Sequence, residues 1–276
     1  MRTAQKIIKA FALCLAGVII ISIVGGIISL VGLLGIVSGE SFDQVEESTI
    51  WAEDVEQVAV RNLEIDVGVA KLEIVALSDI DKIQVRTNIE EIMSWEDNGT
   101  LRIVEKSHFA FFNFVGDQRL SVYVPRGYQF DNIQIKTGAG RLSVDELRAK
   151  RGKLELGAGH AEIRYLELSE SAEIEGGAGA IEIEDAKLKN LDLDLGAGKT
   201  ELTAQIIGNS KISSGVGRLE LNLKQAPGGY RYTVDKGIGA VHIDGAKQGD
   251  DATYGDGDNL IELDCGVGSV EVKTVK

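Results

Sequence analysis

Cysteine is almost missing from this chain of 276 residues, and histidine is scarce. The two cysteines, Cys14 and Cys265, lie near opposite ends of the sequence, so no disulfide framework holds the fold together. The three histidines, His108, His160 and His242, lack the cysteine or carboxylate spacing of a metal site. These absences exclude a disulfide-rich scaffold and a zinc-type ligand set.

Aromatic residues make up only 5% of the chain, and basic residues are outnumbered. All 43 acidic residues follow residue 37, together with 26 of the 29 basic ones, which gives this part a net charge of −17. Such a surface does not suit nucleic acid, and it favours cationic partners or divalent ions. The scarcity of aromatic side chains for stacking also argues against a sugar-binding groove.

Charge is entirely absent from residues 10–37, which are long enough as a helix to cross the ~30 Å hydrocarbon core of a bilayer. Bases precede this stretch and acids follow it, so the positive-inside rule places residues 1–9 in the cytoplasm and everything after the span outside. Residues 38–54 would form a juxtamembrane linker. A cleaved signal peptide is the alternative, but its apolar region usually runs only ~7–15 residues.

Glycine, by contrast, is abundant and regularly placed. A turn of the form Gly-x-Gly, or close to it, occurs eight times, and five successive copies begin 19 or 20 residues apart. The copies begin at Gly68, Gly138, Gly157, Gly177, Gly196, Gly215, Gly237 and Gly266. Spacing of this kind is typical of a repeat architecture.

Apolar residues keep fixed positions around every turn. The third residue before each turn is aliphatic in all eight copies: Ile65, Ile135, Leu154, Ile174, Leu193, Ile212, Val234 and Leu263. The fourth residue after each turn is aliphatic as well: Ile74, Val144, Ile163, Ile183, Leu202, Leu221, Ile243 and Val272. Period-two alternation on both sides of the turn predicts two strands, each with one face inward.

Two all-β architectures fit this pattern. The constant period favours a β-solenoid of about eight coils, in which each corner lies against the next. An antiparallel β-meander or sandwich, with each Gly-x-Gly as a hairpin loop, is the alternative. We expect residues 55–137 to form a first coil with an inserted hairpin around Asp97-Asn98-Gly99 and a Phe-rich loop, and residues 138–276 to form the repeats.

Motifs that resemble nucleotide or calcium sites are incomplete. Gly196 to Thr200 ends like a phosphate-binding loop, but Leu193 stands where that motif needs a glycine. Gly176 to Gly179 resembles a calcium-binding β-roll repeat, but Ile181 stands where an aspartate ligand is needed. No cofactor and no catalytic residue is predicted.

Three features of the expected surface are candidates for function. Two outward columns of acids flank the turns, one two residues before each turn and one three residues after it. An acidic loop carries the metal-ligand candidates Asp250, Asp251, Asp256 and Asp258. A cluster of aromatic residues is a candidate interaction site, either as a cap on the first coil or as a membrane- or partner-binding loop: Phe109, Phe111, Phe112 and Phe114.

Residues 120–140, Leu-Ser-Val-Tyr-Val-Pro-Arg-Gly-Tyr-Gln-Phe-Asp-Asn-Ile-Gln-Ile-Lys-Thr-Gly-Ala-Gly, are followed by serial Gly-Ala-Gly strands. This pattern resembles a bacterial β-strand-repeat family described as "putative adhesins" of unknown function, akin to toast-rack domains of envelope-stress membrane proteins. The resemblance covers about residues 55–276 and implies a cell-envelope role without catalytic residues.

The function expected is therefore a membrane-anchored extracytoplasmic scaffold or interaction module, in which envelope-stress sensing is one role that the resemblance suggests. Its partner would be another envelope protein or a cationic molecule, and not nucleic acid. An adhesin that contacts surfaces or polysaccharide is the first alternative. A polysaccharide-acting enzyme is the second, and the abundance of outward acids singles out no catalytic pair.

Overall fold

The computed structural model describes residues 60–89, 92–105 and 118–275. The chain divides into two compact units, residues 1–46 and 47–276, and every described residue belongs to the second. The expected regions 1–9, 10–37 and 38–54 and the four clustered phenylalanines lie outside the described residues. Within the described residues, no helix is long and apolar enough to cross a membrane.

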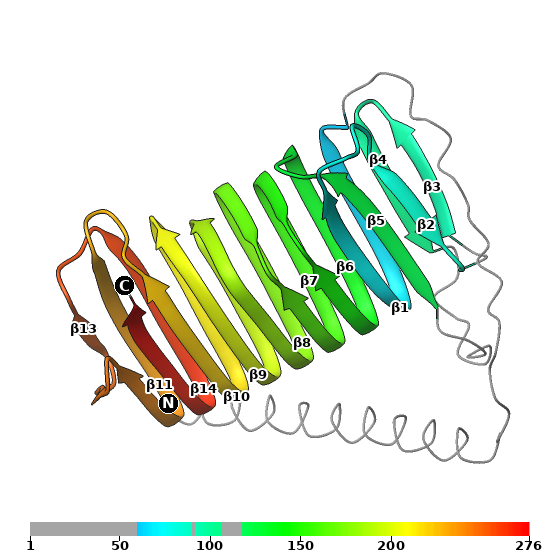
Figure 1. Ribbon diagram of the computed structural model, residues 1–276. Helices are drawn as coiled ribbons and strands as arrows, with labels where there is room; N and C mark the ends of the chain where they lie inside the picture. Colours follow the sequence, from blue (N-terminus) through cyan, green and yellow to red (C-terminus); the bar gives the residue numbers. More distant parts are fainter. Residues whose placement is uncertain (1–59, 90–91, 106–117, 276) are drawn as a thin grey trace, which may run out of the picture. The chain divides into compact units, whose positions relative to one another are not determined.

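The described residues form an all-β fold, as expected (Figure 1). The strands are β1 (Asn62–Leu77), β2 (Gln84–Thr87), β3 (Ile92–Asp97), β4 (Thr100–Glu105), β5 (Arg119–Pro125), β6 (Gln129–Val144), β7 (Leu147–Ile163), β8 (Leu166–Lys189), β9 (Leu191–Ile207), β10 (Asn209–Lys224), β11 (Tyr230–Ile243), β12 (Ala246–Lys247), β13 (Ala252–Tyr254) and β14 (Asn259–Val275).

The long strands each bend through one Gly-x-Gly turn and stack in parallel, in a solenoid-like arrangement. Gly140 pairs with Gly159, and the same register continues through Gly179, Gly198 and Gly217. Parallel pairing between successive repeats rules out the antiparallel meander. The predicted hairpin is also present, because β3 and β4 pair antiparallel across Asp97 and Thr100.

The glycines are needed because neighbouring backbones touch at the corners. Gly198 has φ +147°, and a β-carbon there would lie on the carbonyl oxygen of Gly179 in the preceding coil. Gly159 stands in the same relation to Gly140. The corner glycines therefore set how closely the coils stack.

The predicted apolar columns form the core. All eight residues of the column three before the turn are at most 2% exposed, and all eight of the column four after it are at most 8% exposed. Each coil buries its apolar face against its neighbours, which is the expected basis of stability in a repeat protein.

The ends of the stack depart from chain order. The expectation that each corner lies against the next along the chain is wrong for the last coils, because the order is β10-β14-β11 (Figure 1). β14 pairs in parallel with β10 on one side and β11 on the other. The final strand thereby gains two partners, and the turn-rich segment after β11 is left at the outer edge.

The opposite end holds a coil without a Gly-x-Gly turn. β4 pairs in parallel with the first half of β1, and β5 pairs with the second half. Residues 106–117, which join β4 to β5, lie outside the described residues. Antiparallel strands cover both ends: β3 on β4 and β2 on β5 at one end, and β12 and β13 on β11 at the other.

Candidate functional site

A groove of about 490 Å³ crosses the stack from β1 to β9. One wall is the column six residues before each turn: Asn62, Asn132, Arg151, Ser171 and Asn190. The other wall is the column four residues before each turn: Glu64, Gln134, Lys153, Glu173 and Asp192. Inward residues between these columns also line the groove, but most of its lining side chains are polar.

The first wall is ordered by a chain of hydrogen bonds that runs across the coils. Asn62 Nδ2 donates to Thr100 Oγ1 at 3.1 Å, and Asn132 Nδ2 donates to Asn62 Oδ1 at 2.7 Å. Arg151 Nε then donates to Asn132 Oδ1 at 2.8 Å, and its Nη1 donates to Glu170 Oε2 at 3.0 Å. The amides are thus held in fixed orientations before any ligand arrives.

The second wall contains a lysine surrounded by carboxylates. Lys153 Nζ lies 2.8 Å from Glu173 Oε1 and 2.9 Å from Glu175 Oε1, with Glu155 Oε1 at 3.4 Å. The hydrogen bonds to Glu173 and then to Glu175 raise the pKa of Lys153, while Lys153 lowers the pKa of Glu175. Both cations of the groove, Arg151 and Lys153, are therefore paired with acids and are not free to bind an anionic ligand.

The sequence interpretation missed this groove, although a signal was present. The sixth residue before the turn is asparagine in four of the eight copies: Asn62, Asn132, Asn190 and Asn209. These asparagines lie three positions further from the turn than the apolar column that begins with Ile65.

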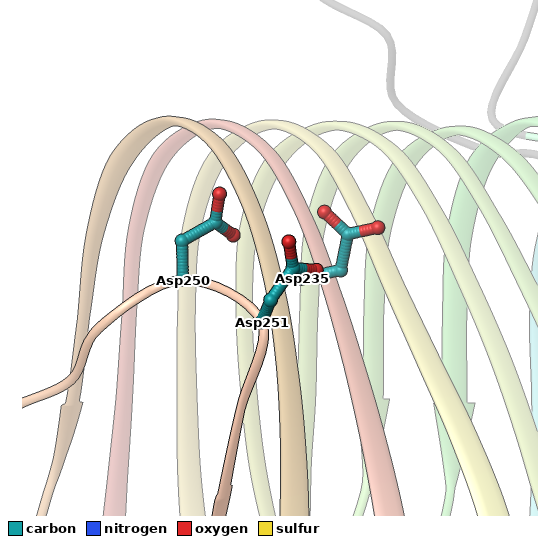
Figure 2. A group of neighbouring side chains, drawn as sticks. All are labelled: Asp235, Asp250 and Asp251. Atoms are coloured by element: carbon teal, nitrogen blue, oxygen red, sulfur yellow. The ribbon is translucent and has the colours of Figure 1, made fainter.

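Acids gather at the end of the stack formed by β11. Carboxylate oxygens of Asp235, Asp250 and Asp251 lie within 4.8 Å of one another, and all three residues are exposed (Figure 2). Asp235 belongs to the predicted acidic column, and Asp250 and Asp251 are two of the four candidates in the predicted acidic loop. The structure therefore brings residues from both predicted features together. The other two metal-ligand candidates, Asp256 and Asp258, are not in this group.

Asp250 already has a structural role in this group. Its Oδ1 accepts a hydrogen bond of 3.0 Å from the backbone N–H of Lys236, on the outer edge of β11. Three exposed carboxylates offer oxygen ligands of the kind that divalent cations prefer. The hydrogen bond from Lys236 N–H accounts for the position of Asp250 without a bound cation.

The predicted acidic columns are stacked as expected. Glu162 pairs with Glu182, Glu182 with Glu201, Glu201 with Glu220, and Glu220 with Glu271. Lysine or arginine lies within 4.0 Å of the last three of these glutamates. The column is thus an outer surface on which glutamates are paired with basic residues.

The histidines and the cysteine that the structure describes are not brought together into one site. His160 lies on β7 and His242 on β11, and neither joins the carboxylate group. Cys265 is buried, and burial with nearby Asp264 raises the pKa of its thiol to about 12. A protonated, enclosed thiol does not serve as a nucleophile.

Three solved structures are similar to this chain at low identity. A "putative cell adhesion protein" from Clostridium sporogenes has 17% identity, with 79% of this chain and 94% of that chain covered and a TM-score of 0.35. A "putative adhesin" from Bacteroides fragilis has 13% identity, 79% and 93% coverage and a TM-score of 0.37. A "putative lipid binding protein" from Parabacteroides distasonis has 16% identity, 80% and 94% coverage and a TM-score of 0.32.

Curated proteins give no match. The sequence profile of one family, Toastrack DUF4097, matches residues 60–271, which is more than half of the chain. This match confirms the resemblance that the serial Gly-Ala-Gly strands indicated. The chain belongs to the Toastrack DUF4097 family.

Proposed function

We propose that this chain is an extracytoplasmic interaction module of the bacterial envelope, anchored by residues 10–37, which binds an extended partner along its groove. The observation that carries the proposal is the groove itself, which draws polar side chains from five coils. An elongated, ordered surface of this kind suits a ligand that is itself extended. No catalytic step is proposed.

The chemistry of the groove restricts its partner. Arg151 and Lys153 are already paired with glutamates, so an anionic polymer would find no free cation there. Amides that both donate and accept hydrogen bonds suit a neutral, polar chain. Another protein of the envelope, bound through its backbone amides, meets this requirement.

Adhesion to a neutral polysaccharide is the second candidate. It is favoured by the same amide lining, because hydroxyl groups also donate and accept. Among the described residues no aromatic side chain lines the groove, so each sugar would contribute little binding energy by stacking. Tight binding would then require many sugar units along the coils.

In-cell photocrosslinking tests the proposal. A photoreactive residue replaces Gln134 in the groove of the full-length chain, and a matched control replaces Glu182, which is exposed outside it. We expect an adduct from position 134 that is absent from position 182. A protein adduct supports the first candidate and a glycan adduct the second, whereas equal labelling at both positions would exclude the groove as the binding surface.

A further inference from the structure

The hairpin of β3 and β4 forms the rim of one end of the stack. β3 is the last strand of the sheet path and pairs only with β4 among the described strands (Figure 1). The neighbouring turn contacts the start of β1, because Gly99 O accepts the backbone N–H of Arg61 at 2.7 Å. The chain therefore enters the described fold beside this hairpin.

One face of the hairpin carries exposed apolar side chains. Met93 and Trp95 are each 39% exposed, and their spacing of two residues puts them on the same face of β3. Val104, which pairs with Met93 from β4, is partly buried. The described residues leave only five large hydrophobic side chains exposed, and two of them stand on this six-residue strand.

The arginine beside this face, Arg102, is already paired with two acids. Arg102 pairs with Trp95 across the hairpin, and its guanidinium lies 2.7 Å from Glu64 Oε2 and 3.7 Å from Asp97 Oδ2. Arg102 is therefore not free to attract anionic headgroups. A surface of tryptophan, methionine and valine whose arginine is outnumbered by acids favours the interfacial zone of a zwitterionic bilayer over anionic headgroups, and tryptophan is enriched in that zone.

We propose that this apolar face, Met93, Trp95 and Val104, contacts the membrane interface next to the chain's own anchor. The inference rests on the proposed anchoring by residues 10–37. Residues 38–59 then separate the bilayer from Val60, which lies beside the hairpin turn. Such a short tether gives this end of the stack a high effective concentration at the lipid surface, so a small apolar contact is sufficient for binding.

Tryptophan fluorescence in vesicles tests the contact, because the chain has only two tryptophans, Trp51 and Trp95. The full-length Trp51→Phe variant is reconstituted in phosphatidylcholine vesicles with and without bromine on the acyl chains. We expect Trp95 emission to be blue-shifted and to be quenched by the brominated lipid. Adding Met93→Glu should reverse both effects while the circular dichroism of the strands stays unchanged.

Three results would overturn the contact. Emission that acrylamide quenches and brominated lipid does not would place Trp95 in water. Emission shielded from both quenchers would show that protein covers the face, whether a second copy or another part of the chain. Quenching that persists with Met93→Glu would show that the face is not responsible.

Flotation of the same vesicles separates this inference from the proposed function. A chain that fails to float with the lipid contradicts the anchor. A chain that floats with Trp95 unquenched keeps the anchor and contradicts the contact.

Discussion

The carboxylate of Glu105 accepts a hydrogen bond of 2.6 Å from the backbone N–H of Gly68, at the first corner of the stack. At the opposite end the carboxylate of Asp250 accepts the backbone N–H of Lys236 at 3.0 Å. Within the stack, a neighbouring coil supplies the acceptors for such groups. At both of these corners, therefore, an acidic side chain is the acceptor for a backbone N–H.

Replacing Glu105 by alanine should destabilise the fold by about 1–3 kcal/mol, because the N–H of Gly68 loses its acceptor. Glu105→Gln keeps an acceptor oxygen and should lose much less. Chemical denaturation followed by circular dichroism measures both variants. Equal losses for alanine and glutamine would show that the charge, and not the hydrogen bond, matters.

Asp250 and Asp251 should differ although they are adjacent. Asp250→Ala should cost about 1 kcal/mol or more in the presence of EDTA, since the bond to Lys236 is independent of any ion. Asp251→Ala leaves that bond in place and should change the melting temperature little. A loss for Asp250→Ala that is seen only with added Ca²⁺ would instead assign the carboxylate to cation binding.

The corner glycines should tolerate no side chain. Gly198→Ala combines an unfavourable φ with a clash against Gly179, so we expect a loss of about 3 kcal/mol or more. Gly127→Ala is the matched control, because Gly127 also has positive φ, +75°, but a β-carbon there meets no atom within 4 Å. Gly127→Ala should lower the free energy of unfolding by only about 1–2 kcal/mol. Similar losses for the two variants would mean that φ alone, and not stacking, requires the corner glycines.

The repeat was predictable because every coil obeys the same local rule. Residues such as Ile135 and Leu193 must point inward whatever coil lies beside them, so their columns alone predict the core. The corner glycines follow from the same logic. These features depend on the period, which a single sequence displays directly.

The ends were not predictable because they break that rule. Nothing local to β14 indicates that it lies between β10 and β11, since its turn has the same form as the others. The sequence between β4 and β5 has no Gly-x-Gly turn, so the repeat pattern does not reveal this coil. The groove was missed for a different reason: its asparagines are outward and polar, and the apolar columns do not reveal them.

Alkaline pH should weaken the fold from about pH 9 upward. The thiol of Cys265 has a pKa of about 12 in the fold, against an ordinary value near 9, because burial disfavours the thiolate. Between these values the unfolded chain releases a proton that the folded chain keeps, so stability falls as pH rises, by at most about 1.4 kcal/mol per pH unit for one group.

Cys265→Ala should remove the contribution of the thiol and leave the decline to begin near pH 10, where Tyr232 and Tyr165, whose pKa burial also raises to about 12, begin to contribute. Burial raises the pKa of Tyr232 from its ordinary value near 10 to about 12. Urea denaturation at pH steps between 8 and 11 measures the slopes. An unchanged slope between pH 9 and 10 in Cys265→Ala would contradict the assignment to the thiol.

The last strand should be among the best protected parts of the chain, although strands near a terminus usually fray. β14 has a parallel partner on each side, and its end is held by Asp244, whose Oδ1 accepts the N–H of Thr274 at 2.7 Å. Hydrogen exchange followed by mass spectrometry should therefore show slower exchange in β14 than in the rim strand β3. Asp244→Ala should accelerate exchange only near Thr274, because the two ladders remain. Rapid exchange throughout β14 would mean that β11, and not β14, stacks directly on β10.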